Sequence, residues 1–248
     1  MISYSAFIKF HGYLNDFLRS VKRNKFCHIM VSGHQTIKDI IESMGIPHVE
    51  VDVILVNKSS VNFKYRIRER DRAEVYGSGN KVRRKNLYHL QVVPLKYPRF
   101  ILDEHLGKLA SKLRMIGIDS CLFNGKTDKD LVEQALRKRR IILTRDVELL
   151  KRSIIKRGYW VRNDDPAKQV TEIYNRFHLE KVLKPFHRCL VCNGLIIKVN
   201  KEEVAAQIPP GSRSRFDEYF RCSSCGKIYW KGSHYEKMKF EIENIIHY

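Results

Sequence analysis

The chain has 248 residues, of which 43% are hydrophobic and 30% are charged, so it is long enough for a buried core and for more than one domain. It contains no apolar run long enough to span a bilayer. The N-terminal "MISYSAFIKFHGYL" lacks the basic head and the cleavage site of a secretory signal. These features exclude an integral membrane protein and favour a cytoplasmic protein without a membrane partner.

The charge of the chain favours a polyanionic partner. Lys and Arg number 47 against 27 Asp and Glu, which gives a formal net charge of +20. Many of the basic residues cluster in residues 81–86, 136–140 and 149–158. Such a positive field attracts nucleic acid first. The alternative is a generally basic surface, and a membrane surface is a weaker candidate because no basic run is flanked by a bulky apolar face.

Residues 1–80 are expected to form a small α+β domain. "AFIKFHGYLNDFL" and "FCHIMVSG" indicate a strand pair, and "QTIKDIIESMG" indicates a helix with Thr36 as N-cap and Gly45 as its end. "VDVILVN" is typical of a buried strand, and "VNFKYRIRERDRAEVYG" has strand-like alternation around a polar turn. This order of elements predicts a β-grasp domain.

The stretch "PHVEVDVILVNKSSVNFKYRIRERDRAEVY" resembles the ubiquitin-like sulfur-carrier proteins. Those carriers need a free Gly-Gly tail, whereas "YGSGNKVRRKN" continues here into a basic linker over residues 81–97. The domain is therefore expected to bind or orient a protein partner rather than to carry sulfur. An adaptor role in sulfur transfer or protein conjugation is a further alternative.

Residues 98–182 alternate between strand and helix patterns, which predicts an α/β core with a mostly parallel sheet. The expected strands are "RFILD", "IDSCLFN", "RIILTRD" and "YWVRN". The expected helices are "EHLGKLASKLRMIG", "DKDLVEQALRKR", "VELLKRSIIKRG" and "DPAKQVTEIYNRF".

Acidic residues gather where ligands bind in such folds, at the carboxyl ends of the strands. Asp103 and Asp146 each end a predicted strand, and Asp128 and Asp130 open a helix. Asp119 stands near a strand start, so its approach to that edge is less direct. Converging carboxylates suit Mg²⁺ or Mn²⁺, which can activate water for attack on a phosphodiester. Helix capping is the alternative explanation for each acid, and Thr127 with Asp130 has the form of a capping box.

Four of the six cysteines form the pairs "CLVC" and "CSSC", namely Cys189, Cys192, Cys222 and Cys225. In a chain without a secretory signal, this spacing predicts structural Zn²⁺ held by four thiolates, with no open position for catalysis. His187 and His234 are alternative ligands, though neither is needed. Cys27 and Cys121 are expected to be small core residues. Residues 183–248 are thus a predicted zinc ribbon with a C-terminal tail.

Basic and aromatic residues near both features are candidates for RNA contact. They are Lys108, Lys112, Arg114 and Arg145 near the acids, and Trp230, Lys231 and His234 in the ribbon. Tyr229 and Trp230 could instead pack the ribbon itself.

"FILDEHLGKLASKLRMIGIDS", "TDKDLVEQALRKRRIILTRD", "RCLVCNG" and "FDEYFRCSSCGKIYWKGSHYEKM" resemble the PIN-like mut-seven C-terminal RNase domain family and its zinc ribbon. The N-terminal region resembles the ubiquitin-like module often fused ahead of that domain. The resemblance implies a metal-dependent ribonuclease in which Asp103, Asp128 and Asp146 match the acidic motif, with Asp119 and Asp130 second in rank. Such an enzyme would leave 5′-phosphate and 3′-hydroxyl ends on RNA, with tRNA and rRNA as candidate substrates. The alternative is a non-catalytic RNA- or ribosome-binding module.

Overall fold

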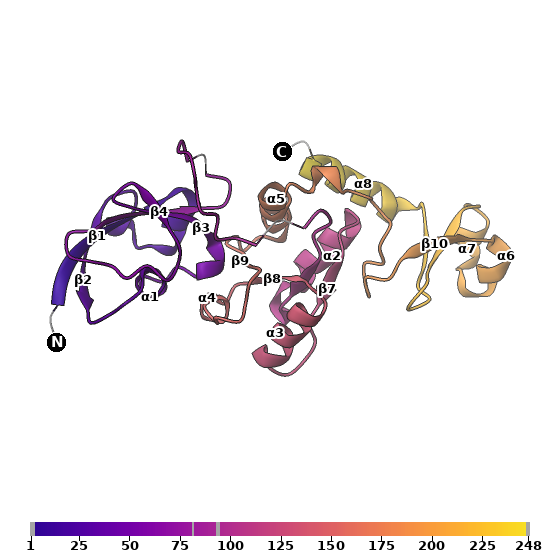
Figure 1. The fold of residues 1–248 in the computed structure, drawn as a ribbon. Coiled ribbons are helices and arrows are strands. Elements are labelled where there is room, and N and C mark those ends of the chain that lie inside the picture. Colours follow the sequence, from indigo (N-terminus) through magenta and orange to yellow (C-terminus); the bar gives the residue numbers. More distant parts are fainter. Residues whose placement is uncertain (1–2, 81, 93–94, 247–248) are drawn as a thin grey trace. The chain divides into compact units, whose positions relative to one another are not determined.

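The computed structural model describes residues 3–80, 82–92 and 95–246, which form two compact units (Figure 1). The first unit comprises Met1–Pro94 and Arg145–Trp160, and the second comprises Leu95–Thr144 and Val161–Tyr248. The bounds of these units differ from those of the predicted domains, because residues 145–160 of the predicted nuclease core pack with the N-terminal region. Positions 81, 93 and 94 of the predicted linker lie outside the described residues.

The first unit contains a five-stranded mixed sheet. Its strands are β1 (Ser3–His11), β2 (Cys27–Ser32), β3 (Val51–Val56), β4 (Ser59–Val61) and β5 (Arg72–Gly77), in the order β2-β1-β5-β3-β4. β1 runs parallel to β5, while the other pairings are antiparallel. Ala6, Ile8 and Phe10 alternate along β1 and are buried, so one face of the sheet covers the core. The predicted β-grasp fold is confirmed.

Helix α1 (Ile37–Ser43) packs on this sheet and has the predicted N-cap. The Thr36 hydroxyl accepts a hydrogen bond from the Asp39 N–H, and the Asp39 carboxylate accepts one from the Thr36 N–H. Ile37, Ile40 and Ile41 are buried in the core of the unit. The short 3-10 turns are η1 (Gly12–Phe17), η2 (Ser20–Lys22) and η3 (His48–Glu50).

The chain turns between β4 and β5, within the stretch where the sequence predicted strand-like positions around a polar turn. The buried Asp71 carboxylate accepts hydrogen bonds from the Arg68 N–H, the Tyr65 hydroxyl and the Asn57 amide at 2.8, 3.0 and 2.7 Å. These bonds organise residues 62–71 as a turn, because local side-chain acceptors compete with the strand ladder for backbone N–H groups.

Part of the predicted linker is anchored to the sheet. The Leu90 N–H donates to the Asp52 carbonyl at 2.7 Å, and His89 Nδ1 lies 2.9 Å from the Asp52 carboxylate. The Tyr88 N–H donates to the Ser60 hydroxyl at 2.9 Å. Residues 88–90 therefore extend the first unit.

The segment 145–160 contains α4 (Val147–Leu150) and β9 (Gly158–Trp160). The prediction of a long helix here is wrong, since only four residues are helical. His48 Nε2 donates to the Ile155 carbonyl at 3.0 Å, and the Trp160 N–H donates to the Glu50 carboxylate at 2.8 Å. The Ile155 carbonyl lies within the predicted helix but bonds to the His48 side chain of η3, so tertiary packing overrides the helical pattern there.

The second unit has a parallel sheet formed by β6 (Phe100–Leu102), β7 (Ser120–Leu122) and β8 (Ile141–Thr144). β6 is central and fully buried. The chain re-enters this unit at Val161, whose N–H donates to the Thr144 carbonyl at 2.9 Å. The predicted parallel-sheet α/β core is confirmed.

The helical elements of this core are η4 (Glu104–Leu106), α2 (Gly107–Met115), α3 (Asp128–Arg137), α5 (Pro166–Phe177) and η5 (Leu179–Lys181). Leu109, Ala110 and Leu113 of α2 are fully buried, as their spacing predicted. Gly117 follows α2 with a φ of +88°, and a Cβ there would lie 2.0 Å from the Lys184 carbonyl oxygen. Only glycine allows the chain after α5 to approach α2 this closely.

The C-terminal region of the second unit has a three-stranded antiparallel sheet of β10 (Ile196–Val199), β11 (Tyr219–Cys222) and β12 (Ile228–Trp230). The excursion between β10 and β11 contains α6 (Lys201–Val204), η6 (Ala205–Gln207) and α7 (Pro210–Arg213). It has its own small core of Val204, Ile208 and Tyr219. The chain then forms α8 (Ser233–Ile246).

Candidate active site and metal centre

The four paired cysteines form a compact sulfur cluster. Their Sγ atoms all lie within 4.8 Å of one another, with Cys189 and Cys225 at 3.6 Å and Cys192 and Cys222 at 3.4 Å. Tetrahedral Zn²⁺ with Zn–S bonds of about 2.3 Å places its sulfurs about 3.8 Å apart. The cluster therefore fits a four-thiolate metal site with no open position.

The backbone of the two knuckles repeats the same turn. Asn193 and Gly226, each directly after the second cysteine of its pair, have φ values of +68° and +74°. The N–H of Asn193 donates to the Cys189 carbonyl, and that of Gly226 donates to the Cys222 carbonyl. This left-handed turn directs both sulfurs of each pair to one side, which explains the Asn and Gly after the Cys-x-x-Cys motifs.

The electrostatics of the cluster favour a bound cation. Burial opposes ionisation of the Cys189 thiol, but the Tyr229 hydroxyl 3.0 Å away and nearby backbone N–H groups lower its pKa to about 6. Burial and the neighbouring cysteine sulfurs raise the pKa of Cys192 to about 12. Four thiolates this close repel one another unless a divalent cation neutralises them.

Arg114 was predicted to contact RNA, and the structure contradicts this. Its side chain is buried on α2, where Nε donates to the Ser120 carbonyl at 2.7 Å. Its Nη1 donates to the carbonyls of Leu190 and Val191 in the first cysteine knuckle at 2.9 and 2.8 Å. Arg114 therefore anchors the knuckle to the parallel-sheet core.

Asp119 takes part in a second anchor of the knuckle. Asp119 directly precedes β7, and its carbonyl accepts a hydrogen bond from the Phe100 N–H at the amino end of β6. Asp119 therefore lies at the edge of the parallel sheet opposite to the edge that carries Asp103. Its carboxylate accepts from Arg140 at 2.6 Å and from the Asn193 amide at 2.8 Å. Burial acts to raise the pKa of Asp119, but these hydrogen bonds lower it. The geometry thus separates Asp119 from Asp103.

Asp103 lies at the carboxyl end of β6. Its Oδ2 accepts a 2.5 Å hydrogen bond from the Thr144 hydroxyl at the end of β8, and its Oδ1 accepts from the His105 N–H at 3.1 Å. The carboxylate thus caps η4 and also bonds to the neighbouring strand. Thr144 was not identified from the sequence, although it ends a buried run two residues before Asp146.

Asp128 and Asp130 occupy the first turn of α3, which follows β7 through residues 123–127, and both are exposed. Thr127 is the N-cap: its hydroxyl accepts from the Asp130 N–H at 3.2 Å and donates to the Asp130 carboxylate at 2.8 Å. The Asp130 carboxylate is therefore hydrogen-bonded to the N-cap residue of α3.

Asp146 and Arg145 begin the segment that belongs to the first unit, and both are exposed. Asp146 caps α4 by accepting from the N–H groups of Glu148 and Leu149 at 2.8 and 3.1 Å. In the described part of the chain, the four cysteines are the only group of three or more metal-binding side chains whose ligand atoms lie within 4.8 Å of one another. Asp103 and Asp128 of the second unit are not part of such a group, and their convergence with Asp146 of the first unit stays a prediction.

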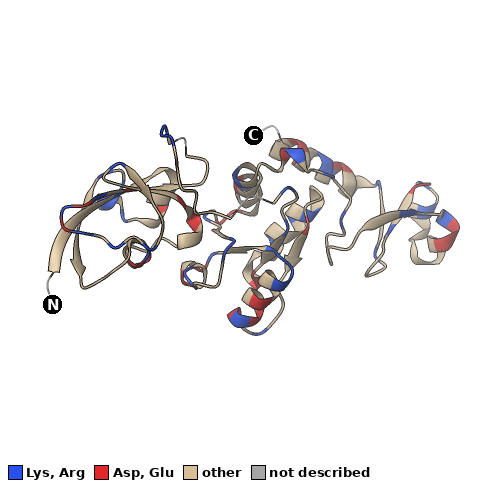
Figure 2. Ribbon diagram, viewed as in Figure 1, with Lys and Arg blue, Asp and Glu red and all other residues tan. Residues whose placement is uncertain are grey.

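Two of the basic residues predicted to bind RNA line one cavity of about 390 Å³ in the second unit. Lys108 is exposed, whereas Lys112 forms an ion pair with Glu241 of α8. Asp165 also lines this cavity and caps α5. Asp165 was not identified from the sequence, although an Asp directly before a proline at a helix start is a recognisable capping signal. Figure 2 shows acidic and basic residues side by side along α3 and α8.

In the ribbon, Trp230 is half-buried at the end of β12, and Lys231 and His234 are exposed. Tyr229, the residue before Trp230, contacts the sulfur cluster through its hydroxyl. The aromatic residues thus have packing and metal-site contacts, as the alternative interpretation expected, and they also line an open cavity.

These features define a class of protein: a β-grasp domain joined to a parallel-sheet α/β core with a four-cysteine ribbon. A family model described as "Mut7-C RNAse domain" matches residues 98–242, and one described as "Mut7-C ubiquitin" matches residues 3–83. The chain belongs to the Mut7-C RNase domain family and has a ubiquitin-like domain ahead of that domain. The resemblance seen in the sequence is confirmed.

Among solved structures, the chain is similar to a putative molybdopterin converting factor, subunit 1, from Pyrococcus furiosus. The identity is 16% over 30% of this chain and 97% of that chain, with a TM-score of 0.24. No curated protein matches the chain. Within the described residues, no helix is both long enough and apolar enough to cross a membrane.

Proposed function

We propose that this protein is a metal-dependent ribonuclease that hydrolyses RNA phosphodiesters and leaves 5′-phosphate and 3′-hydroxyl ends. The observation that carries the proposal is the match of residues 98–242 to the Mut7-C RNase domain, in which Asp103 stands at the carboxyl end of the central strand. Ligands of parallel α/β sheets bind at this edge.

Asp103, Asp128 and Asp146 are the residues proposed to hold Mg²⁺ or Mn²⁺. Asp103 and Asp128 follow neighbouring parallel strands, and Asp146 comes two residues after Thr144, which bonds to Asp103. Mg²⁺ binds through one or two carboxylates and keeps several waters, so three directly coordinating carboxylates are not required. A cation held there lowers the pKa of a bound water and stabilises charge on the phosphate oxygens.

The chain's own residues have separate tasks in this reaction. Thr144 donates to one oxygen of Asp103 and so orients its carboxylate. Lys108, which is exposed, and Arg145, which directly precedes Asp146, are the residues proposed to bind the RNA backbone by its phosphates. A water oxygen attacks phosphorus, the P–O3′ bond breaks, and O3′ takes up a proton while the attacking water loses one.

The test is cleavage of end-labelled tRNA and rRNA by zinc-loaded protein. Chelator-treated protein is supplied with Zn²⁺ alone or with Zn²⁺ and Mn²⁺, which separates loss of the ribbon metal from loss of the proposed catalytic ion. We expect 5′-phosphate products only with Mn²⁺ or Mg²⁺, and none from the Asp103→Asn variant. Asp217→Asn is the matched control, because Asp217 is an exposed aspartate of the ribbon that bonds to Lys201 and is not one of the candidate acids. Equal turnover by the Asp103→Asn and wild-type proteins would refute the assignment.

A second candidate is a non-catalytic RNA- or ribosome-binding module. It is favoured by the observation that Asp103 and Asp146 both act as helix N-caps, which gives each carboxylate a structural task. RNA binding without cleavage at any metal concentration would support this candidate. In either case, we propose that the β-grasp domain contacts a protein partner rather than carrying sulfur, because the chain continues beyond Gly79.

A further inference from the structure

A cavity of about 340 Å³ opens between the ribbon sheet and the start of α8, and no part of the reaction above uses it. We call it the ribbon pocket. It lies wholly in the second unit. Its lining combines aromatic rings with cations, and the residues that matter here are Phe186, Lys198, Tyr229, Trp230, Lys231 and Tyr235. Its volume is at the lower end of the range for small-molecule sites, which suits a ligand the size of a nucleoside.

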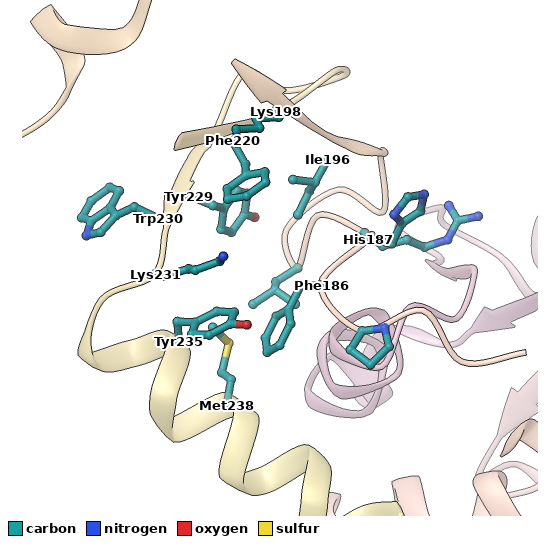
Figure 3. A pocket seen from close by; sticks show the side chains of 13 residues that line it. Phe186, His187, Ile196, Lys198, Phe220, Tyr229, Trp230, Lys231, Tyr235 and Met238 are labelled. Carbon is teal, nitrogen blue, oxygen red and sulfur yellow. The ribbon is translucent and has the colours of Figure 1, made fainter. Parts of the chain in front are cut away.

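The aromatic walls of the ribbon pocket are held in place by different parts of the fold. Phe186 and Tyr235 pack with ring centroids 4.5 Å apart and an interplanar angle of 37°. The Tyr229 hydroxyl lies 3.0 Å from Cys189 Sγ, so its ring is oriented by the metal knuckle. Figure 3 shows Phe186, Tyr229 and Tyr235 around the cavity, with the Lys231 side chain extending between them. A planar ligand would meet rings that are already positioned.

The charge of the pocket favours an anion next to that planar group. Lys198 and Lys231 both donate to the Glu218 carboxylate, at 2.8 and 2.7 Å. Their hydrogen bonds lower the pKa of Glu218 to about 2, so this group of three side chains carries one net positive charge at neutral pH. Both lysines are exposed, and a phosphate can replace the carboxylate as their partner.

We propose that the ribbon pocket binds one unstacked base of single-stranded RNA and that Lys198 and Lys231 bind the adjacent phosphate. Bases splayed out of single strands stack on aromatic side chains in this manner, while cations neutralise the backbone. The proposal deepens the proposed function and rests on RNA being the ligand. It assigns the ribbon a part in holding the strand.

The chain permits a direct optical test, because it has two tryptophans and one of them lines the pocket. A Trp160→Phe background leaves Trp230 as the single reporter, and Asp103→Asn is added to prevent cleavage. Full-length, zinc-loaded protein is titrated with a hexauridylate, with a hexaadenylate and with the mononucleotides UMP and AMP. We expect saturable quenching of Trp230 by the oligomers, and binding of the mononucleotides that is weaker by at least tenfold.

Substitutions in the pocket are compared with matched changes outside it. Tyr235→Ala should weaken oligomer binding roughly tenfold, because one base–ring stack is lost, while Tyr235→Phe should retain binding. Tyr97→Ala, at a tyrosine that is 63% exposed and outside the pocket, should have no effect. Zinc content is measured for each variant, so that loss of the ribbon fold is recognised.

The lysine pair is tested by removing its carboxylate. Glu218→Gln should tighten oligomer binding several-fold and make it more salt-dependent, since both lysines become available to phosphate. Asp217→Asn is the control. The Asp217 side chain is 92% exposed, and this substitution changes the net charge by the same amount one residue away from Glu218. Equal effects of the two substitutions on oligomer binding would show that only the overall positive charge of the protein matters. That result would contradict phosphate binding by Lys198 and Lys231.

The outcomes separate this proposal from the nuclease proposal. Cleavage of RNA together with unchanged oligomer binding by Tyr235→Ala would overturn the ribbon pocket and leave the nuclease intact. Quenching that Tyr235→Ala abolishes, without cleavage by the wild type, would support the pocket and overturn the nuclease. Equally tight binding of UMP and the oligomer would show a free-nucleotide site and overturn the proposal for a strand.

Discussion

Replacing the buried Arg114 by Met tests whether the cysteine knuckle depends on the parallel-sheet core. The change removes three hydrogen bonds of 2.7, 2.9 and 2.8 Å to the carbonyls of Ser120, Leu190 and Val191. Methionine fills much of the same volume but leaves these acceptors without their charged donor.

The size of the effect follows from two opposing contributions. Hydrogen bonds to a charged group contribute about 1.5–3 kcal/mol each. Burial of the guanidinium, which lowers the pKa of Arg114, offsets part of that sum. We expect a net loss of about 3–5 kcal/mol, as is typical when one member of a buried charged network is removed. For a chain of this size, that corresponds to a fall in Tm of roughly 10 °C.

The assay is thermal unfolding followed by circular dichroism, together with the rate of zinc release to a chromogenic chelator. The control is Arg137→Met, at an exposed arginine near the end of α3. The Arg114→Met variant should melt at a lower temperature and lose zinc faster than the control. A Tm within 2 °C of the wild type, or a folded Arg114→Lys variant that loses RNA affinity while keeping its zinc, would refute the anchoring role.

Removal of the ribbon metal by a chelator, or a Cys192→Ser substitution, should abolish amide-exchange protection in β10–β12 and leave β6–β8 protected, as hydrogen–deuterium exchange would show. Asp119→Asn should destabilise the protein more at pH 7 than at pH 3. The pKa of Asp119 is lowered by folding, so its contribution is present above the usual pKa of an aspartate and is lost as the pH falls through the folded value; urea unfolding at both pH values checks this. Gly117→Ala should cost more than about 2 kcal/mol because of its positive φ and its contact with Lys184, whereas Gly211→Ala, where a Cβ meets nothing within 4 Å, should be close to neutral in the same unfolding assay.

Local signals in the sequence were sufficient to predict several features of the structure. The four cysteines were identified because a tetrahedral sulfur site requires short Cys-x-x-Cys turns, and the structure brings their sulfurs together. Thr36 was identified as an N-cap because its bonds are made within three residues. The burial of Leu109 and Leu113 on α2 followed from helical spacing.

Predictions that depended on distant partners were less successful. Arg114 was assigned to RNA because a basic residue on a helix is usually solvated, yet its partners lie in the knuckle 76 residues further along the chain. Residues 147–158 have a helical pattern, but the Ile155 carbonyl bonds to the side chain of His48 instead of continuing the helix. No local pattern in the sequence indicates hydrogen bonds between residues so far apart in the chain.

The sequence by itself determined the β-grasp and parallel-sheet classes and the set of cysteines, because these depend on periodicity, turn residues and motif spacing, and its resemblance to a known family indicated the family. Only the tertiary structure decided which charged residues are ligand candidates and which are structural. Asp119 and Arg114 are engaged in anchoring the knuckle, and Asp103 meets Thr144 across neighbouring strands. The physical reason is that the partner of a buried charge is set by packing between elements far apart in the chain.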